Sequence, residues 1–208
     1  MFRVDNVTFN FGSEKILQDF SVDISSGEKI AFKGESGSGK TTILKMLMGF
    51  LQPDDGKILF NKKKLDIPTT KELRSECAWL PQDLNLGSDS VREVIEFPFG
   101  FRNNGSIRLS KKRLHSVLDQ LGIESSMLDK NFRDLSTGQR QRIGLTICIL
   151  LERSVLFLDE PTSALDENSV KKVIEMLLKD SGLTVISTSH DPVWLKNCSR
   201  VVEINKLA

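Results

Sequence analysis

The chain has 208 residues, a length that suits one sizeable domain or a domain with a subdomain. Hydrophobic residues make up 39% of the sequence and charged residues 27%, which is ordinary for a soluble globular protein. The formal net charge of +1 provides no basic field of the kind that indicates nucleic-acid binding, so we expect no nucleic-acid partner.

Cysteine usage and hydropathy bear on the compartment. Cys77, Cys148 and Cys198 are far apart and form no CxxC pair, which indicates reduced thiols in a cytosolic protein. Charged and polar residues interrupt the opening MFRVDNVTFN at once, so we do not read it as a signal peptide. The longest apolar stretch, IGLTICILL, falls well short of the roughly 20 residues of a membrane span, so we expect this chain not to cross a bilayer by itself.

The first part of the chain is predicted to form strands. Apolar and polar residues alternate in VTFNF (7–11) and in FSVDI (20–24), which indicates strands with one buried face. SSGEK is a turn, and KIAFK is a third short strand. After a glycine-rich loop, apolar residues follow helical spacing and stop near Gly49.

The middle of the chain, about 83–150, is interpreted as a helical insertion. Ser90 and Glu93 form a capping-box pattern, and apolar residues from Leu114 onward follow helical spacing up to Gly122. Beyond it, VLFL (155–158) reads as a buried parallel strand, an amphipathic helix follows, and LTVIST and RVVEIN read as two more strands. Strands that alternate with helices imply an α/β fold with a mainly parallel sheet.

The glycine-rich loop GESGSGKTT matches the pattern GxxxxGK[ST] and lies between a strand and a helix, where that pattern binds nucleotide phosphates. Its backbone N–H groups and the helix N-terminus are expected to hold phosphate oxygens. Lys40 reaches the β and γ phosphates, and the Thr41 hydroxyl suits Mg²⁺. The expected nucleotide-binding residues are Gly34, Glu35, Ser36, Gly37, Ser38, Gly39, Lys40, Thr41 and Thr42.

Kinases, GTPases and motor ATPases all use such a loop, so the loop alone does not identify the reaction. An acidic motif further along the chain reduces the number of possible reactions. The buried strand in SVLFLDEP ends in Asp159 and Glu160. One carboxylate there can hold the Mg²⁺ shell, and the next can polarise an attacking water. The alternative is that the two acidic residues only make caps or turn contacts at a strand end. The phosphate loop elsewhere in the chain makes this alternative less favoured.

The stretch LSTGQRQR also looks like a helix start. Ser136 and Gln139 fit the S-x-x-Q capping box, and a capped helix N-terminus is an anion site. Gly138 allows close backbone approach at this place. The local pattern alone leaves open why a chain with a phosphate loop should carry a second such site.

GESGSGKTT, LSTGQRQR, VLFLDEP, SALD and STSH occur in this order, and through them the chain resembles the nucleotide-binding subunit of ABC transporters along essentially its whole length. The resemblance implies a single domain, 1–208, with a P-loop NTPase core, an N-terminal antiparallel β subdomain and the helical insertion. It also implies that two copies pair head to tail around ATP and Mg²⁺. Ser136, Gly138 and Gln139 would then face the γ-phosphate held by the other copy.

The resemblance assigns roles to further residues. Phe11 resembles the aromatic residue that stacks on adenine, where the family often has tyrosine, and Phe9 is the competing candidate. The remaining assignments are a glutamine that senses Mg²⁺ and the attacking water (Gln82), a Mg²⁺ ligand (Asp159), a general base (Glu160), a contact across the dimer (Asp166) and a γ-phosphate sensor (His190).

One position departs from the family pattern. The usual signature is LSGGQ, and Thr137 stands in place of its first glycine. Threonine restricts the backbone and adds bulk beside the phosphate. Because Ser136 and Gly138 are intact, we expect hydrolysis to survive.

The resemblance implies that ATP hydrolysis drives a separate transmembrane permease, with this chain at the cytoplasmic face of the membrane. Phe97, Phe99 and Phe101 are candidates for contact with that partner, and ordinary packing of the insertion is the alternative. The same tract is loosely similar to small bacterial subunits suggested to act in metal-ion export. Two other classes stay open, a non-transport ABC ATPase such as an iron–sulfur assembly ATPase and a phosphate-loop kinase, and LSTGQ with SALD argues against the kinase.

Overall fold

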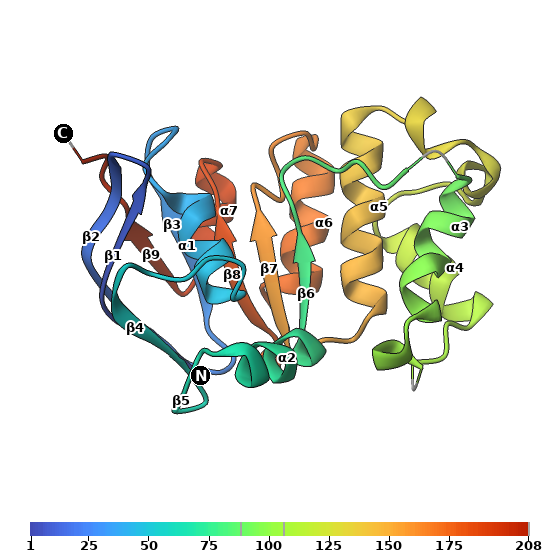
Figure 1. Cartoon of the computed structure of the whole chain (residues 1–208). Coiled ribbons are helices and arrows are strands. Elements are labelled where there is room, and N and C mark those ends of the chain that lie inside the picture. The colour runs from blue at the N-terminus through green and yellow to red at the C-terminus, as the bar shows by residue number, and fades with distance from the viewer. Residues whose placement is uncertain (88, 106, 208) are drawn as a thin grey trace.

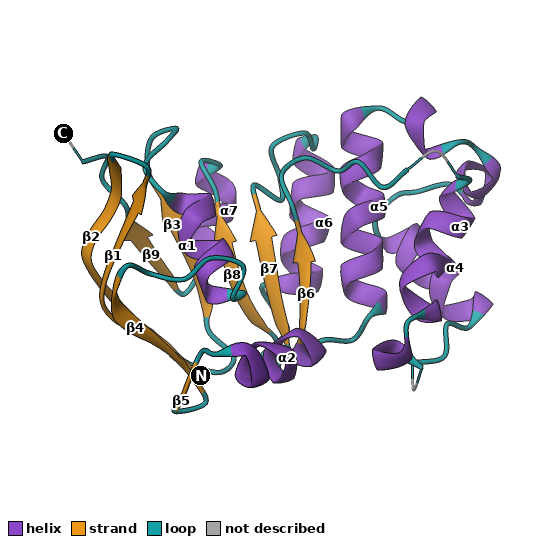
Figure 2. Ribbon diagram, in the orientation of Figure 1, coloured by secondary structure: helices purple, strands orange, loops and turns teal. Residues whose placement is uncertain are grey.

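Two β-sheets form the frame of the protein (Figure 2). Over residues 1–87, 89–105 and 107–207, which the computed structural model describes, one sheet has four antiparallel strands and the other has five parallel strands. The expected mainly parallel sheet and the N-terminal antiparallel β subdomain are both confirmed.

The antiparallel sheet has the order β2-β1-β4-β5. Its strands are β1 (Phe2–Phe11), β2 (Glu14–Ile24), β4 (Asp55–Phe60) and β5 (Lys63–Lys64). Burial alternates along β1, so that Val7 and Phe9 lie in the core. This alternation is the period of a strand with one buried face.

The parallel sheet has the order β6-β7-β8-β3-β9. Its strands are β3 (Lys29–Lys33), β6 (Cys77–Leu80), β7 (Val155–Asp159), β8 (Thr184–Thr188) and β9 (Arg200–Glu203). Every residue of β7 and β8 is buried, as expected of strands covered on both faces. Because all five strands run the same way, their carboxyl ends meet at one edge, where ligands bind in such sheets.

Helices cover this sheet and extend beyond it (Figure 1). They are α1 (Lys40–Leu47), α2 (Ile67–Glu76), α3 (Val91–Glu96), α4 (Lys111–Gln120), α5 (Thr137–Leu150), α6 (Glu167–Leu177) and α7 (Pro192–Asn197). The predicted capping box at Ser90 and Glu93 is present. Within the described part of the chain, no helix is both long and apolar enough to span a bilayer.

The buried apolar side chains of the described residues gather in two clusters. One joins α1 to both sheets, and the other joins α3, α4, α5 and α6 to strands β6, β7, β8 and β3 of the parallel sheet. α5 lies between that sheet and α3 and α4 (Figure 1), and it contacts β6, α3 and α4. α5 therefore connects the helical part of the molecule to the sheet.

Candidate functional site

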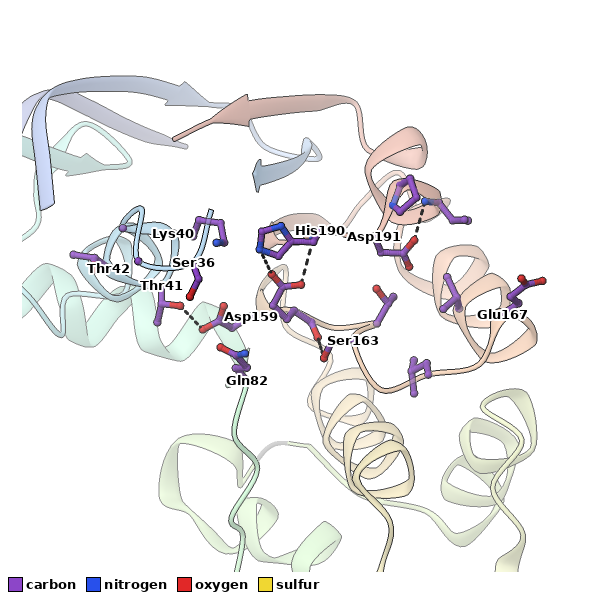
Figure 3. Close-up of a pocket in the computed structure, with 18 of the residues that line it drawn as sticks. Ser36, Lys40, Thr41, Thr42, Gln82, Asp159, Ser163, Glu167, His190 and Asp191 are labelled. Atoms are coloured by element: carbon purple, nitrogen blue, oxygen red, sulfur yellow. Dashed lines mark hydrogen bonds and ion pairs between the residues drawn. The ribbon is translucent and has the colours of Figure 1, made fainter. Parts of the chain in front are cut away.

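A cavity of about 990 Å³ lies at the carboxyl edge of the parallel sheet. Figure 3 shows the predicted residues Lys40, Thr41, Gln82, Asp159 and His190 around it. They come from the start of α1, from the last residue of β7 and from the segments that follow β6 and β8. Segments far apart in the sequence therefore meet where the sequence motifs predict one site. The predicted residues that line the cavity are Ser36, Gly37, Gly39, Lys40, Thr41, Thr42, Gln82, Asp159, Glu160 and His190.

The phosphate loop has the backbone that its glycines permit. Gly37 and Gly39 have φ angles of 79° and 97°, which L side chains rarely adopt. Lys40 directs its Nζ back into the loop and donates to the carbonyl oxygens of Gly34 (2.8 Å) and Glu35 (2.9 Å). Phosphate oxygens can replace these carbonyls as partners of the ammonium, because both are hydrogen-bond acceptors.

Three predicted loop residues, Gly34, Glu35 and Ser38, are not among the described residues that line the cavity, and Glu35 is exposed. A Cβ on Gly34 would collide with the carbonyl oxygen of Ile204 and with Ser38 Oγ, so this position admits only glycine. Ser38 is buried, and its Oγ has no hydrogen-bond partner among the described residues. A buried hydroxyl without a partner is costly, which is consistent with a site whose ligand supplies one.

The side chains expected to hold Mg²⁺ lie together. Thr41 Oγ1 donates to Asp159 Oδ2 at 2.9 Å, and Thr188 Oγ1 donates to Asp159 Oδ1 at 2.5 Å. A hydroxyl, a carboxylate and the side chain of Gln82 form an oxygen donor set that fits Mg²⁺, which keeps few protein ligands and binds phosphates as well. The described residues hold no group of three His, Cys, Asp or Glu that could cage a metal alone.

Glu160 has the environment of a base. Its Oε2 accepts from the His190 backbone N–H at 3.3 Å, and its Oε1 lies 3.4 Å from His190 Nε2. Burial raises the pKa of this carboxyl, and nearby Asp159 adds to the rise, whereas His190 and Lys40 oppose it. A raised pKa brings the carboxyl closer to the range in which it can take a proton near neutral pH.

The backbone of Glu160 is held in an unusual conformation. Its φ angle is 51°, a strained value for a residue with a side chain. Its N–H donates to the hydroxyl of Thr188 at 3.0 Å, and its carbonyl oxygen accepts from Gln141 Nε2 at 2.6 Å and from Ser163 Oγ at 3.1 Å.

The signature stretch begins a helix, as predicted. Ser136 Oγ accepts from the Gln139 N–H, and Gln139 Oε1 accepts from the Ser136 N–H, so the capping box is complete. Thr137 is the exposed first residue of α5. Ser136, Gly138 and Gln139 are not among the described residues that line the cavity, so they do not complete the site of their own chain.

Asp166 has a local role in this chain. It is the N-cap of α6 and accepts from the Ser169 hydroxyl and N–H, and these hydrogen bonds lower the pKa of its carboxyl.

The two candidate aromatic residues differ in exposure. Phe9 is 8% exposed and belongs to the core of the antiparallel sheet, so it cannot stack on a ligand. Phe11 is 75% exposed at the end of β1. Its ring is free to stack on a base, and this role stays a prediction.

Several residues of the site were not expected from the sequence. Ile16, Thr162 and Ser163 line the cavity, and Thr188 and Gln141 hold the backbone of Glu160. Ser163 and Thr162 could have been suspected from their place just after DEP. Thr188 and Gln141 carry no local signal, because their partners are 28 and 19 residues away in the sequence.

Comparison with known proteins agrees with this geometry. A family model described as ABC transporter matches residues 17–163. The chain is 34% identical over 200 residues to the ABC transporter ATP-binding protein YxdL of Bacillus subtilis, covering 92% of this chain and 77% of that protein. It is also 33% identical to the ATP-dependent lipid A-core flippase of Desulfotalea psychrophila over 208 residues, covering 97% of this chain but only 36% of the flippase.

A solved structure gives the same result for the fold. The dimeric ATP-binding cassette MJ0796, in a post-hydrolysis state bound to ADP and Pi, superposes with a TM-score of 0.85 at 26% sequence identity. The match covers 98% of this chain and 94% of that chain.

Proposed function

This chain belongs to the ABC transporter family, and we propose that its ATPase activity powers a transmembrane permease carried on a separate polypeptide. The observation that carries the chemistry is the meeting of Lys40, Asp159 and Glu160 at one cavity. On this proposal the chain works at the cytoplasmic face of the membrane and is held there by its partner. Its relatives include both a protein named as an ABC transporter ATP-binding protein and a much longer flippase, of which this chain covers 36%.

The phosphate loop binds ATP and sets the γ-phosphate beside the base. Lys40 leaves the carbonyls of Gly34 and Glu35 and pairs with phosphate oxygens. Thr41, Asp159 and Gln82 would hold Mg²⁺, which would supply positive charge to neutralise the phosphates. Phe11 stacks on the adenine ring.

Hydrolysis follows from the position of Glu160. Its carboxylate takes a proton from water, the water oxygen attacks the γ-phosphorus, and the bond from that phosphorus to the bridging oxygen breaks to release ADP. His190 contacts the carboxylate through its ring and its backbone N–H, so it keeps the base in place and offers a donor to the phosphate.

The site is completed by a second copy. ABC ATPase domains dimerise, as MJ0796 does. Ser136 and Gly138 lie at the N-terminus of α5, where the helix dipole and the N–H groups of the first turn favour an anion. Because they are outside their own chain's cavity, we assign them to the γ-phosphate of the partner chain, with Gln139 and Asp166 at the same interface.

An apolar cavity supports the proposed permease contact. Its volume is about 470 Å³, and it lies between β6, α3 and α5, with Trp79, Leu84, Leu86, Phe97 and Gly144 among its lining residues. Phe97 and the neighbouring Phe101 are 68% and 50% exposed, which suits a surface that a partner covers. Phe99 packs against the core instead, so the packing alternative holds for it.

A co-purification experiment tests the proposed membrane partner. Tagged Glu160→Gln is purified from mildly solubilised cells with ATP and Mg²⁺, conditions under which closed dimers should accumulate because the base is missing. A multi-span membrane protein in stoichiometric amount supports the proposal. Recovery of soluble proteins alone would favour the non-transport ABC ATPase. The matched control, Phe97→Ala in the same background, should lose the membrane protein and keep ATP binding.

A further inference from the structure

Gln141 connects α5 to the segment that contains the base. It is only 5% exposed, and its carboxamide makes two hydrogen bonds to backbone groups. Nε2 donates to the carbonyl oxygen of Glu160 at 2.6 Å, and Oε1 accepts from the N–H of Ala164 at 3.1 Å. One side chain therefore fixes both ends of the segment 160–164.

The Glu160 end of this segment needs such support. Its positive φ angle of 51° belongs to a class of strained conformations that persist only where the surroundings enforce them. Thr188 on β8 holds the N–H of Glu160, and Gln141 on α5 holds its carbonyl together with the Ser163 hydroxyl. The direction of the carboxylate depends on both, because a backbone rotation at Glu160 moves its side chain.

The same face of α5 touches the segment a second time. Gly138 precedes Gln141 by three residues, a spacing that places both on one helix face. A Cβ on Gly138 would fall closer than 3.0 Å to the carbonyl oxygen of Ala164, so the helix backbone lies directly on the segment. The start of α5 therefore packs against the far end of the segment that begins with the base.

We propose that Gln141 is a positioning residue for ATP hydrolysis, which sets the backbone of Glu160 and ties the direction of its carboxylate to the N-terminus of α5. Gln141 is not among the described residues that line the nucleotide cavity, so it acts through Glu160 and does not touch the substrate. The inference rests on the proposed function, because it takes Glu160 as the base. It adds that displacement of the signature helix displaces the base as well.

The alternative is that Gln141 only satisfies two buried backbone groups. Its loss would then lower stability, since a buried donor or acceptor left without a partner is costly, and would leave turnover of the folded protein unchanged. Turnover and nucleotide affinity must therefore be measured separately.

The experiment replaces Gln141 by methionine, which has similar length and no strong hydrogen-bonding group. We expect kcat to fall about tenfold or more, a loss within the range of misplaced general bases, with KM for ATP changed less than about twofold. Gln141→Leu serves as a second variant, and ATP binding certifies that each is folded. A kcat within about twofold of wild type in either folded variant would overturn the proposal.

A matched control comes from the same helix. Thr146 is fully buried, and its hydroxyl donates to the Arg142 carbonyl at 2.9 Å, away from the segment 160–164. Thr146→Val removes one buried hydrogen bond at nearly constant volume. It should lower stability and leave kcat unchanged, and an equal kcat loss in both variants would show that Gln141 is only structural.

A double-mutant cycle separates this inference from the base assignment. In the Glu160→Gln background, Gln141→Met should cost nothing further in the single-turnover rate, because both changes disable the same group. A cost that adds to that of Glu160→Gln would overturn the role of Gln141. If Glu160→Gln alone keeps the wild-type rate, the proposed base is wrong, whatever Gln141 does.

Discussion

Replacing Gly138 by alanine should destabilise the protein, whereas the same change at Gly144 should not, although both residues lie within α5. In a helix, Gly to Ala gains about 0.8–1.0 kcal/mol from backbone propensity. At Gly138 the new Cβ meets the carbonyl oxygen of Ala164, which is backbone and cannot rotate away. Overpacking of this kind costs about 1–3 kcal/mol. The clash therefore outweighs the propensity gain, and we expect a net loss of up to about 2 kcal/mol.

An added Cβ at Gly144 would contact side chains that can move, and no backbone atom is among its nearest neighbours. Its added Cβ would lie 2.6 Å from Leu80 Cδ1 and 2.9 Å from Leu84 Cδ1, the ends of two flexible side chains. All three residues line the apolar cavity of about 470 Å³, so the methyl groups have space to move. We expect the propensity gain to survive, with a change in unfolding free energy between zero and about 1 kcal/mol in favour of the variant.

Urea denaturation measures both variants, with midpoints compared at an unchanged slope. The predicted order of stability is Gly144→Ala at or above wild type, and Gly138→Ala below it. Equal shifts, or a more stable Gly138→Ala, would refute the contact between α5 and the backbone of Ala164. An altered slope would indicate a change in the compactness of either state and would require the comparison to be repeated by thermal unfolding.

Three further predictions concern the nucleotide site. Burial raises the pKa of Glu160 in the folded state, so between the unfolded and the folded pKa the folded chain binds more protons, and its stability falls as pH rises through that range. Glu160→Gln removes this charge and should therefore raise Tm at pH 7, with a smaller gain at acid pH. A gain in Tm that does not change with pH would contradict the raised pKa. Phe11→Ala should raise KM for ATP about fivefold or more, since stacking on a base is worth about 1–3 kcal/mol, with kcat nearly unchanged; an unaltered KM would exclude the stacking role. Thr41→Val should raise the Mg²⁺ concentration needed for half-maximal turnover, and an unchanged Mg²⁺ titration would remove Thr41 from the metal site.

Local patterns predicted the elements that carry a strong periodic or motif signal. The phosphate loop before α1, the capping box at Ser136 and the apolar strand β7 are examples. Each depends on interactions within a few residues, so the sequence contains them directly. The elements β4, β5, β6, α2 and α7 are not predicted from the sequence. β5, β6 and α7 are short, and α2 buries only Thr69 and Leu73, too few to show a helical period.

Contacts between distant segments account for what the sequence could not reveal. The hydrogen bonds of Thr188 and Gln141 to Glu160 depend on strand order and on the placement of α5, and no local pattern encodes either. The positive φ of Glu160 has the same origin, since nothing in LDEPTS requires it. The roles assigned to Ser136 and Asp166 across a dimer stay predictions, because the single chain explains both as helix caps.

The most direct test of the account is a mixing experiment between two inactive variants. Glu160→Gln lacks the base. Ser136→Asp keeps a good helix cap but sets a negative charge where the partner's γ-phosphate is expected. If each site combines the base of one chain with the signature of the other, mixed dimers contain one complete site. Steady-state ATPase activity should then recover to about a quarter of wild type, since half of randomly assorted dimers are mixed. A mixture that stays as inactive as its components, although the chains exchange, would contradict the shared site.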